Sequence, residues 1–284
     1  MNILVLGASG MLGSAMYRVL AEQGVNSVFG TLRSSSSKKY FNPEFHDALI
    51  DGIDVENHDS LVSAFSKVRP DAVVNCVGLV KQLAEADNPL SAVPINSILP
   101  HRLAALCKVA GTRLIHISTD CVFSGQKGNY VESDFPDAHD LYGRTKLIGE
   151  VDYPHAVTLR TSIIGRELVG ARSLLCWFLS QSGQTKGFTK AVFSGLPTNE
   201  LARVVRDVVL PRPELHGLYH VAAKPIDKHT LLRLIADVYG KQIDITPDDQ
   251  LVIDRSLCAD RFREATGYVA PSWPELVQAM YEFH

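Results

Sequence analysis

The stretch "NILVLGASGMLG", residues 2–13, sets three glycines between an apolar β-forming run and a helix-forming segment. Gly7 permits a tight turn, Gly10 lets the backbone approach a diphosphate, and Gly13 allows the helix to pack closely on the strand. The first turn of such a helix offers free N–H groups and positive potential to phosphate oxygens. The spacing is G-x-x-G-x-x-G rather than G-x-G-x-x-G, and a purely structural turn is the alternative. The strand, loop and helix setting favours a dinucleotide site.

The order of segments along the first 160 residues extends this unit into a sheet. Short β-rich apolar runs alternate with helical stretches, which predicts a parallel, doubly wound α/β fold of the Rossmann type. Helices then cover both faces of the sheet. We expect strands over residues 2–7, 26–32, 71–78, 113–119, 156–164 and 217–223. We expect helices over residues 11–24, 58–70, 100–111, 173–183, 227–240 and 271–283, and a strand followed by a helix over 191–210.

Composition and charge narrow the partners of the chain. Of its 284 residues, 21 % are charged and the net charge is −3, which disfavours nucleic acid and anionic membranes as main partners. The N-terminus lacks the pattern of a signal peptide, and no apolar run reaches the roughly 18 residues of a membrane span, so we predict a cytoplasmic protein. The five cysteines are widely spaced and the ten histidines do not cluster with them, so we predict reduced thiols and no metal site.

The residues after the second predicted strand bear on the choice of cofactor. An NAD site usually has an acidic residue here for the ribose 2′-hydroxyl, whereas an NADP site has arginine or polar residues for the 2′-phosphate. In "GTLRSSSS", residues 30–37, the side chains of Thr31, Arg33 and Ser34 occupy this place without a carboxylate. The sequence therefore favours NADP(H) over NAD(H), with a solvated loop arginine as the alternative interpretation of Arg33.

A tyrosine and a lysine are four residues apart in "DLYGRTKLIGE", residues 140–150. On a helix, Tyr142 and Lys146 would share one face, so the phenol and the ammonium group can converge. A neighbouring cation stabilises a phenolate and lowers the pKa of the phenol from its ordinary value of about 10, which would make Tyr142 a usable acid. The alternative is a half-buried tyrosine beside a solvated lysine.

Three ordered motifs together resemble a known family. "GASGMLG" at 7–13, "STDCVFSG" at 118–125 and "YGRTK" at 142–146 are similar to those of the extended short-chain dehydrogenases/reductases, and most similar to the dTDP-4-dehydrorhamnose reductase group. The resemblance covers most of the chain. It includes "PINSILPHRLAALC" at 94–107 and "LRTSIIG" at 159–165.

The resemblance implies a role for each matching residue. Thr119 matches the family's hydroxyl residue, Tyr142 its tyrosine acid, and Lys146 the lysine that binds the nicotinamide ribose and tunes the tyrosine. Strand alternation puts Ser118 on the opposite face from Thr119, so Ser118 is predicted to be a core hydroxyl. The residues expected to bind the cofactor are Gly7, Ser9, Gly10, Met11, Leu12, Gly13, Thr31, Arg33, Ser34, Asp54, Val55, Cys76, Val77, Gly78, Tyr142 and Lys146. The residues expected to bind the substrate are Thr119, Asp120, Val80, Arg160, Thr198 and Asn199.

Two features leave the substrate interpretation open. Arg160 is placed at the substrate because an arginine fork suits a diphosphate bidentately, and the alternative is an arginine that anchors a loop or lies on the surface. Near relatives have an aromatic residue where this chain has Cys121, which leaves the sugar open.

The expected domains follow from the motifs. We expect the first part of the chain to form a cofactor-binding domain and a smaller C-terminal lobe to bind the substrate. The polar segments 34–37 and 125–140 are predicted to be loops over the cleft between them. The first unit comprises residues 1–160 with strand and helix segments of 191–223, and the lobe comprises residues 161–190 and 224–284.

The resemblance implies an NADPH-dependent reduction of the keto group, most simply the 4-keto group, of a deoxysugar nucleotide in polysaccharide biosynthesis. An NAD(P)-linked nucleotide-sugar epimerase and a non-catalytic NADP-binding regulatory subunit stay open as alternatives, because the same fold and site serve all three. A nucleotide sugar is the expected partner, and a homodimer is left open.

Overall fold

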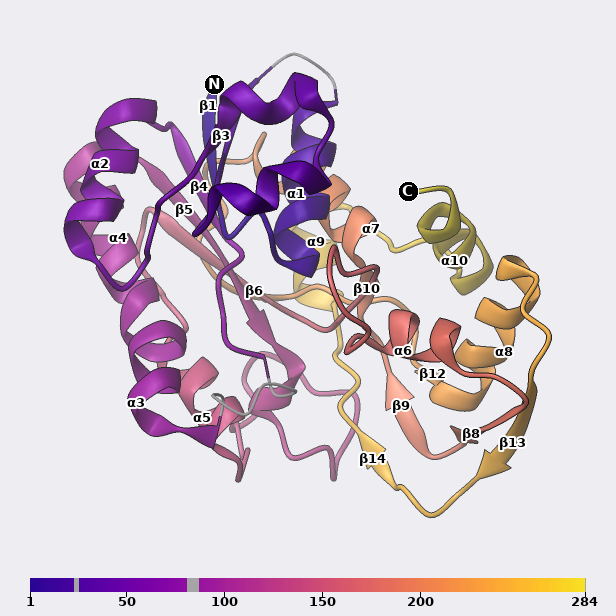
Figure 1. Cartoon of the computed structure of the whole chain (residues 1–284). Coiled ribbons are helices and arrows are strands. Elements are labelled where there is room, and N and C mark those ends of the chain that lie inside the picture. The colour runs from indigo at the N-terminus through magenta and orange to yellow at the C-terminus, as the bar shows by residue number, and fades with distance from the viewer. Residues whose placement is uncertain (23–25, 81–86, 284) are drawn as a thin grey trace.

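Seven parallel strands form the main sheet of the computed structural model, which describes residues 1–22, 26–80 and 87–283 (Figure 1). The strand order is β11-β6-β5-β4-β1-β2-β3, so the order reverses at β1, which lies between β2 and β4. The predicted doubly wound α/β fold is confirmed. The strands are β1 (Asn2–Leu6), β2 (Ser27–Thr31), β3 (Leu49–Ile50), β4 (Ala72–Asn75), β5 (Arg113–Thr119), β6 (Ala156–Thr161) and β11 (Gly217–His220).

Helices cover both faces of this sheet, and each face has its own buried cluster. On one face, α1 packs with α7 and the π-helical turn η6 over residues such as Val74 and Leu159. On the other face, α2 and α4 pack over Leu4 and Val73. The bounds are α1 (Met11–Ala21), α2 (His58–Val68), α4 (Leu99–Ala110), α7 (Thr198–Arg203) and η6 (Val204–Val209). The predicted end of the first helix, at residues 23–24, lies outside the described residues.

Helix α4 continues two shorter helical segments, α3 (Pro89–Ala92) and the π-helical turn η4 (Val93–Ile98). Helix α5 (Leu141–Ile148) packs against η4 and against the short 3₁₀ turn η5 (Asp120–Val122) that follows β5. The expected loop at 34–37 begins a 3₁₀ helix, η1 (Ser35–Tyr40), because the Ser34 hydroxyl accepts a hydrogen bond from the Ser36 amide. A second 3₁₀ helix, η2 (Pro43–Ala48), precedes β3.

Apart from α7, η6 and β11, which belong to the main sheet and its covering helices, the chain after β6 builds a smaller lobe beside the sheet (Figure 1). The expected strand 156–164 breaks after Thr161, and its end forms β7, which pairs with β10. Strand β9 pairs with β12 and β14, and β8 pairs with β13, so β9 belongs to the lobe although residues 191–223 were assigned to the sheet domain. The strands of the lobe are β7 (Ile163–Ile164), β8 (Gln184–Phe188), β9 (Ala191–Phe193), β10 (Leu196–Pro197), β12 (Ile226–Asp227), β13 (Asp244–Asp248) and β14 (Ile253–Asp254). Its helices are α6 (Leu174–Ser180), α8 (Lys228–Tyr239), α9 (Asp260–Thr266) and α10 (Trp273–Glu282).

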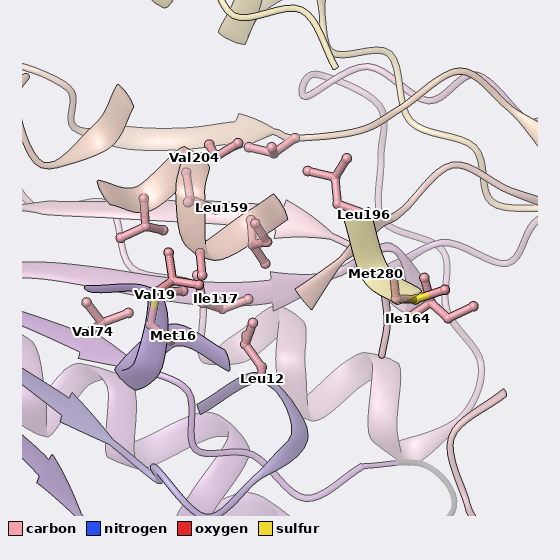
Figure 2. Close-up of a cluster of buried hydrophobic side chains, with 14 of the residues drawn as sticks. Leu12, Met16, Val19, Val74, Ile117, Leu159, Ile164, Leu196, Val204 and Met280 are labelled. Carbon is pink, nitrogen blue, oxygen red and sulfur yellow. The ribbon is translucent and has the colours of Figure 1, made fainter. Parts of the chain in front are cut away.

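One buried cluster runs from the sheet into the lobe. Figure 2 shows Met16 of α1 and Leu159 of β6 in the same cluster as Ile164 of β7, Leu196 of β10 and Met280 of α10. Each of these five side chains is at most 3 % exposed. The lobe is therefore packed on the sheet through apolar contacts.

Two negative findings concern the described residues only. They contain no group of histidine, cysteine and acidic side chains arranged to hold a metal ion. None of their helices is both long enough and apolar enough to cross a membrane. All five cysteines are unpaired thiols, as the sequence predicts.

We expect Leu159→Ala to lower the free energy of unfolding by about 2–5 kcal/mol, because it leaves a cavity in the cluster of Figure 2. The matched control is Val109→Ala on α4, where the side chain is 88 % exposed and the change should stay within about 0.5 kcal/mol. Urea unfolding of both variants measures the difference. Equal effects would show that Leu159 does not lie in a closely packed core.

Candidate active site

The glycine loop joins β1 to α1 and fits closely against its surroundings. A Cβ atom on Gly13 would overlap the carbonyl oxygen of Gly7, so the helix can approach the strand only with glycine at this position. Gly7 has a φ of 77°, and its amide donates a hydrogen bond of 3.1 Å to the Thr31 hydroxyl. Thr31 is 2 % exposed and thus holds the loop, which corrects the expectation that it contacts the ribose phosphate directly.

Beyond Thr31 the chain becomes accessible. Arg33 and Ser34 are exposed after the end of β2, and Asp54 is exposed after β3, the neighbouring strand. Because parallel strands end at the same edge of a sheet, these residues lie at the edge that carries the glycine loop. Val55 is half-buried beside Asp54.

Residues 76–78 bring the end of β4 against both the glycine loop and Lys146. A Cβ on Gly7 would lie 2.9 Å from Cγ2 of Val77, and a Cβ on Gly78 would lie 4.0 Å from Nζ of Lys146. The Val77 amide donates to the Asn75 side chain at 3.1 Å, which explains why β4 ends at Asn75 and not at residue 78 as predicted. Burial raises the pKa of the Cys76 thiol to about 12.

Helix α5 carries Tyr142 and Lys146 to the end of β5. Its N-terminus is capped by Asp140, which accepts a hydrogen bond of 2.8 Å from the Gly143 amide. A Cβ on Gly143 would overlap the carbonyl oxygen of Cys121, so this glycine lets α5 approach the segment after Thr119. Lys146 is 5 % exposed and donates a hydrogen bond of 2.9 Å to the Ile117 carbonyl, which excludes the alternative of a solvated lysine.

The ionisation of this pair differs from the expectation. Burial raises the pKa of Tyr142, and a hydrogen bond with Thr119 opposes the rise. Burial lowers the pKa of Lys146 to about 8. The ammonium group of Lys146 points at a backbone carbonyl, so the predicted lowering of the tyrosine pKa by Lys146 is wrong for the free protein.

Thr119 and Asp120 lie beside two cations that the sequence interpretation missed. The Thr119 hydroxyl donates to Asp120 at 3.2 Å and accepts from the Cys121 amide at 3.1 Å. Arg255, after β14, donates to the Phe123 carbonyl at 2.8 Å, and its positive charge lowers the pKa of Asp120, which burial raises more strongly. Lys228 is the first residue of α8, and Asp120 raises its pKa while burial lowers it more strongly.

The lobe therefore contributes charged groups to the edge of the sheet where Thr119 and Tyr142 lie. Lys228 and Arg255 escaped notice because a lysine at a helix start and an arginine in a loop are common. The sequence carried little signal for them, because the two side chains come close to Asp120 only in the folded chain, from more than a hundred residues away.

Asn96 is a second residue that the sequence interpretation missed. It lies in η4, is 1 % exposed, and binds the backbone of Leu79 twice, accepting from its amide at 2.9 Å and donating to its carbonyl at 3.2 Å. Its amide group also donates to Thr145 of α5 at 3.3 Å. Asn96 thus ties the loop after Gly78 to the helix that carries Lys146. An asparagine in the apolar segment "PINSILP" was the available signal, because a buried amide needs partners.

Three predicted substrate residues do not face the site as expected. Arg160 is 2 % exposed and donates to both carboxylate oxygens of Glu150, at 2.8 and 2.6 Å, so the prediction that it binds a diphosphate is wrong. Thr198 is 3 % exposed, and Asn199 is 0 % exposed and donates to the Ala279 carbonyl of α10 at 3.0 Å. Asn199 thus joins α7 to α10 of the lobe. Val80 is 44 % exposed beyond residues 76–78, where contact with a ligand stays a prediction.

Residues 1–251 match the family model of the RmlD substrate binding domain. A probable low-salt glycan biosynthesis reductase, Agl14 of Haloferax volcanii, is 28 % identical over 93 % of this chain and 87 % of that protein. The methionine adenosyltransferase 2 subunit beta of Danio rerio is 28 % identical over 84 % of this chain and 74 % of that protein. The dTDP-4-dehydrorhamnose reductase of Salmonella typhimurium is 29 % identical over 78 % of this chain and 73 % of that protein.

The solved structures agree on the fold. The dTDP-4-dehydrorhamnose reductase of Bacillus anthracis, crystallised with NADP, aligns with a TM-score of 0.81 over 99 % of this chain and 98 % of that chain, at 18 % identity. The family predicted from the motifs is confirmed. The chain belongs to the RmlD substrate binding domain family, and with it to the NAD(P)-dependent oxidoreductases of the extended short-chain dehydrogenase/reductase type.

Proposed function

We propose that this chain is an NADP(H)-dependent reductase that acts on the 4-keto group of a deoxysugar nucleotide, with Tyr142 as the proton donor. The observation that carries the proposal is the meeting of Thr119, Tyr142 and Lys146 beside residues 76–78 at the carboxyl edge of the sheet. A hydroxyl, a phenol and a buried ammonium group can neutralise the charge that develops on a carbonyl oxygen during reduction.

The residues around the glycine loop fit a dinucleotide that carries a 2′-phosphate. Helix α1 begins after Gly10 without a side-chain cap, and amides of this kind bind the oxygens of a diphosphate. The exposed side chains of Arg33 and Ser34 suit the 2′-phosphate, while Asp54 and Val55 suit the adenine. When bound, a nicotinamide cofactor supplies the hydride.

The side chains of the site have separate tasks in this proposal. The phenol of Tyr142 is protonated at neutral pH and so has a proton to give, and burial, which raises its pKa, makes it a weaker acid than a free phenol. Thr119 lies within hydrogen-bond reach of that phenol and orients the carbonyl oxygen between the two hydroxyls. Below a pH of about 8, Lys146 is charged and stabilises the phenolate left after proton transfer.

The second lobe is proposed to hold the nucleotide sugar. Lys228 and Arg255 place two cations next to Asp120, and a diphosphate is the part of the substrate that such cations recognise. Asp120 can accept a hydrogen bond from a sugar hydroxyl. This division assigns the cofactor to the sheet domain and the substrate to the lobe.

A binding subunit without turnover is the second candidate, because the relatives include methionine adenosyltransferase 2 subunit beta proteins. The two candidates differ in one measurement. Purified protein is mixed with NADPH and a panel of 4-keto deoxysugar nucleotides, and the loss of NADPH absorbance is followed. Oxidation that depends on one sugar supports the reductase, whereas tight NADPH binding without oxidation supports the binding subunit.

We expect Tyr142→Phe to lower turnover at least about 100-fold while NADPH binding stays nearly unchanged, because the variant lacks only the hydroxyl group that donates the proton. Single-turnover kinetics and a fluorescence titration with NADPH measure the two quantities. Tyr153→Phe is the matched control, since this tyrosine is 39 % exposed and bonds His101 on the outside of the site. Turnover of Tyr142→Phe within a few-fold of wild type would show that another group supplies the proton.

We expect Arg33→Ala to weaken the binding of NADPH by about tenfold or more and to leave the binding of NADH nearly unchanged, because NADH lacks the 2′-phosphate. Arg263→Ala, an exposed arginine of α9, serves as the control. Isothermal titration of both cofactors measures the ratio. An equal loss for NADPH and NADH would mean that Arg33 does not contact the 2′-phosphate.

We expect Lys228→Gln to raise the KM of the nucleotide sugar by about tenfold while the affinity for NADPH is retained, because a charge-assisted contact with the diphosphate is lost. Lys190→Gln is the control, since this lysine is exposed in the same lobe and pairs with Asp249. Initial rates at varied sugar concentration measure KM. An unchanged KM would place the diphosphate away from Lys228.

A further inference from the structure

A buried ion pair lies just beyond the helix that carries Lys146. Arg160 of β6 binds both carboxylate oxygens of Glu150, and the Ser118 hydroxyl donates a third hydrogen bond of 2.6 Å to the same carboxylate. The side chains of Arg160 and Glu150 are 3 % and 11 % exposed. Moving two charges out of water costs several kcal/mol per ion, so a pair in this place contributes little to stability by itself.

One end of this pair lies close to Lys146, because the carbonyl that accepts from Lys146 and the hydroxyl that donates to Glu150 belong to Ile117 and Ser118, consecutive residues of β5. The carboxylate of Glu150 raises the pKa of Lys146, opposing the burial that lowers it. Two other titratable groups face the lysine, Cys76 at the end of β4 and His116 of β5. Burial raises the pKa of the Cys76 thiol to about 12 and holds the pKa of His116 well below its ordinary value, so both groups are uncharged at neutral pH.

The neutrality of His116 follows from its contacts as well. It is 0 % exposed, and its Nδ1 faces the Asn75 amide nitrogen at 3.1 Å. A positive charge on this ring would lie near both Lys146 and His101, which disfavour it. Among the described residues whose charges act on Lys146, Glu150 is thus the anionic one, and it is paired with Arg160.

The other end of the pair reaches the strand that leads to the second lobe. Arg160 donates to Nε2 of His220 in β11 at 3.2 Å, and Nδ1 of His220 faces the Tyr130 carbonyl at 3.0 Å. The His220 amide donates to the Glu132 side chain at 2.8 Å. After β11 the chain runs through β12 to Lys228 at the start of α8.

We propose that the Glu150–Arg160 pair is a positioning unit for the site: Glu150 keeps Lys146 charged, and Arg160 ties the end of the catalytic helix to β11. Its catalytic consequence rests on the proposed function, because Lys146 has a task in turnover only if the chain is a reductase. Glu150 and Arg160 are positioning residues, since they act through Lys146 and His220.

The test measures the titration of Lys146 directly in the full chain without cofactor. Protein labelled with ¹³C at the lysine ε-carbon is titrated by NMR, and Lys146→Met assigns the resonance. Wild-type protein should titrate near pH 8, and Glu150→Gln should titrate at least about one pH unit lower, because the anion that favours the ammonium form is gone. Glu150→Asp, which keeps the charge, should titrate close to wild type. Asp207→Asn, which removes an arginine-paired carboxylate from η6, should cause no shift.

A second variant covers the case in which Glu150→Gln fails to fold because Arg160 is left buried without its carboxylate. Glu150→Gln combined with Arg160→Met removes both charges. It should fold and should titrate below wild type, by less than Glu150→Gln does, because the Arg160 cation that Glu150→Gln leaves unpaired is also gone. Where the reductase is active, the alkaline fall of kcat/KM should move to lower pH by the same amount. Folded variants in which Lys146 titrates as in wild type would overturn the proposal and leave the pair a structural contact. A chain without reductase activity would still report the NMR shift, so the two proposals fail separately.

Discussion

Lys146 donates a hydrogen bond to the Ile117 carbonyl, and the geometry of the site depends on that contact. A buried ammonium group needs an acceptor, and a strand interior has few carbonyl groups that are not already used. Helix α5 must therefore lie at the end of β5, which brings Tyr142 to Thr119. Gly143 permits this approach because a side chain there would overlap the Cys121 carbonyl. The position of the Lys146 ammonium group thus fixes the position of the Tyr142 phenol.

The surrounding elements hold this arrangement from two directions. On the cofactor side, Asn96 joins the loop after Gly78 to α5 through contacts with Leu79 and Thr145. On the lobe side, the ion pair of Glu150 and Arg160 joins the end of α5 to β6 and β11. A shift of α5 would break polar contacts on both sides, and unpaired polar groups in a buried place are costly. The helix is therefore held by satisfied polar contacts as much as by apolar packing.

The sequence predicted the parts of the fold that depend on local patterns. Strand β5 was predicted with its observed bounds, because "RLIHIST" alternates β-branched residues, Ile115, Ile117 and Thr119, along its length. Strands β8 and β13 were missed, since "QTKGF" and "DITPD" are largely polar and become strands only by pairing with each other across about sixty residues. The positions of Tyr142 and Lys146 came from motif spacing. The direction of their pKa shifts did not, because burial is a property of the assembled site.

Three basic residues could not be assigned correctly from the sequence alone. Arg160 was predicted at the substrate, yet it faces Glu150, whereas Lys228 and Arg255 were passed over and lie next to Asp120. All three are cations near strand or helix ends, so local sequence cannot separate them. The three residues differ in the carboxylate that each one faces. Arg160 is paired with Glu150, so its charge is neutralised and it has no place for an anionic ligand. Lys228 and Arg255 both face Asp120, so their two positive charges exceed its single negative charge. A net positive charge remains beside Thr119, and an anionic substrate would neutralise it.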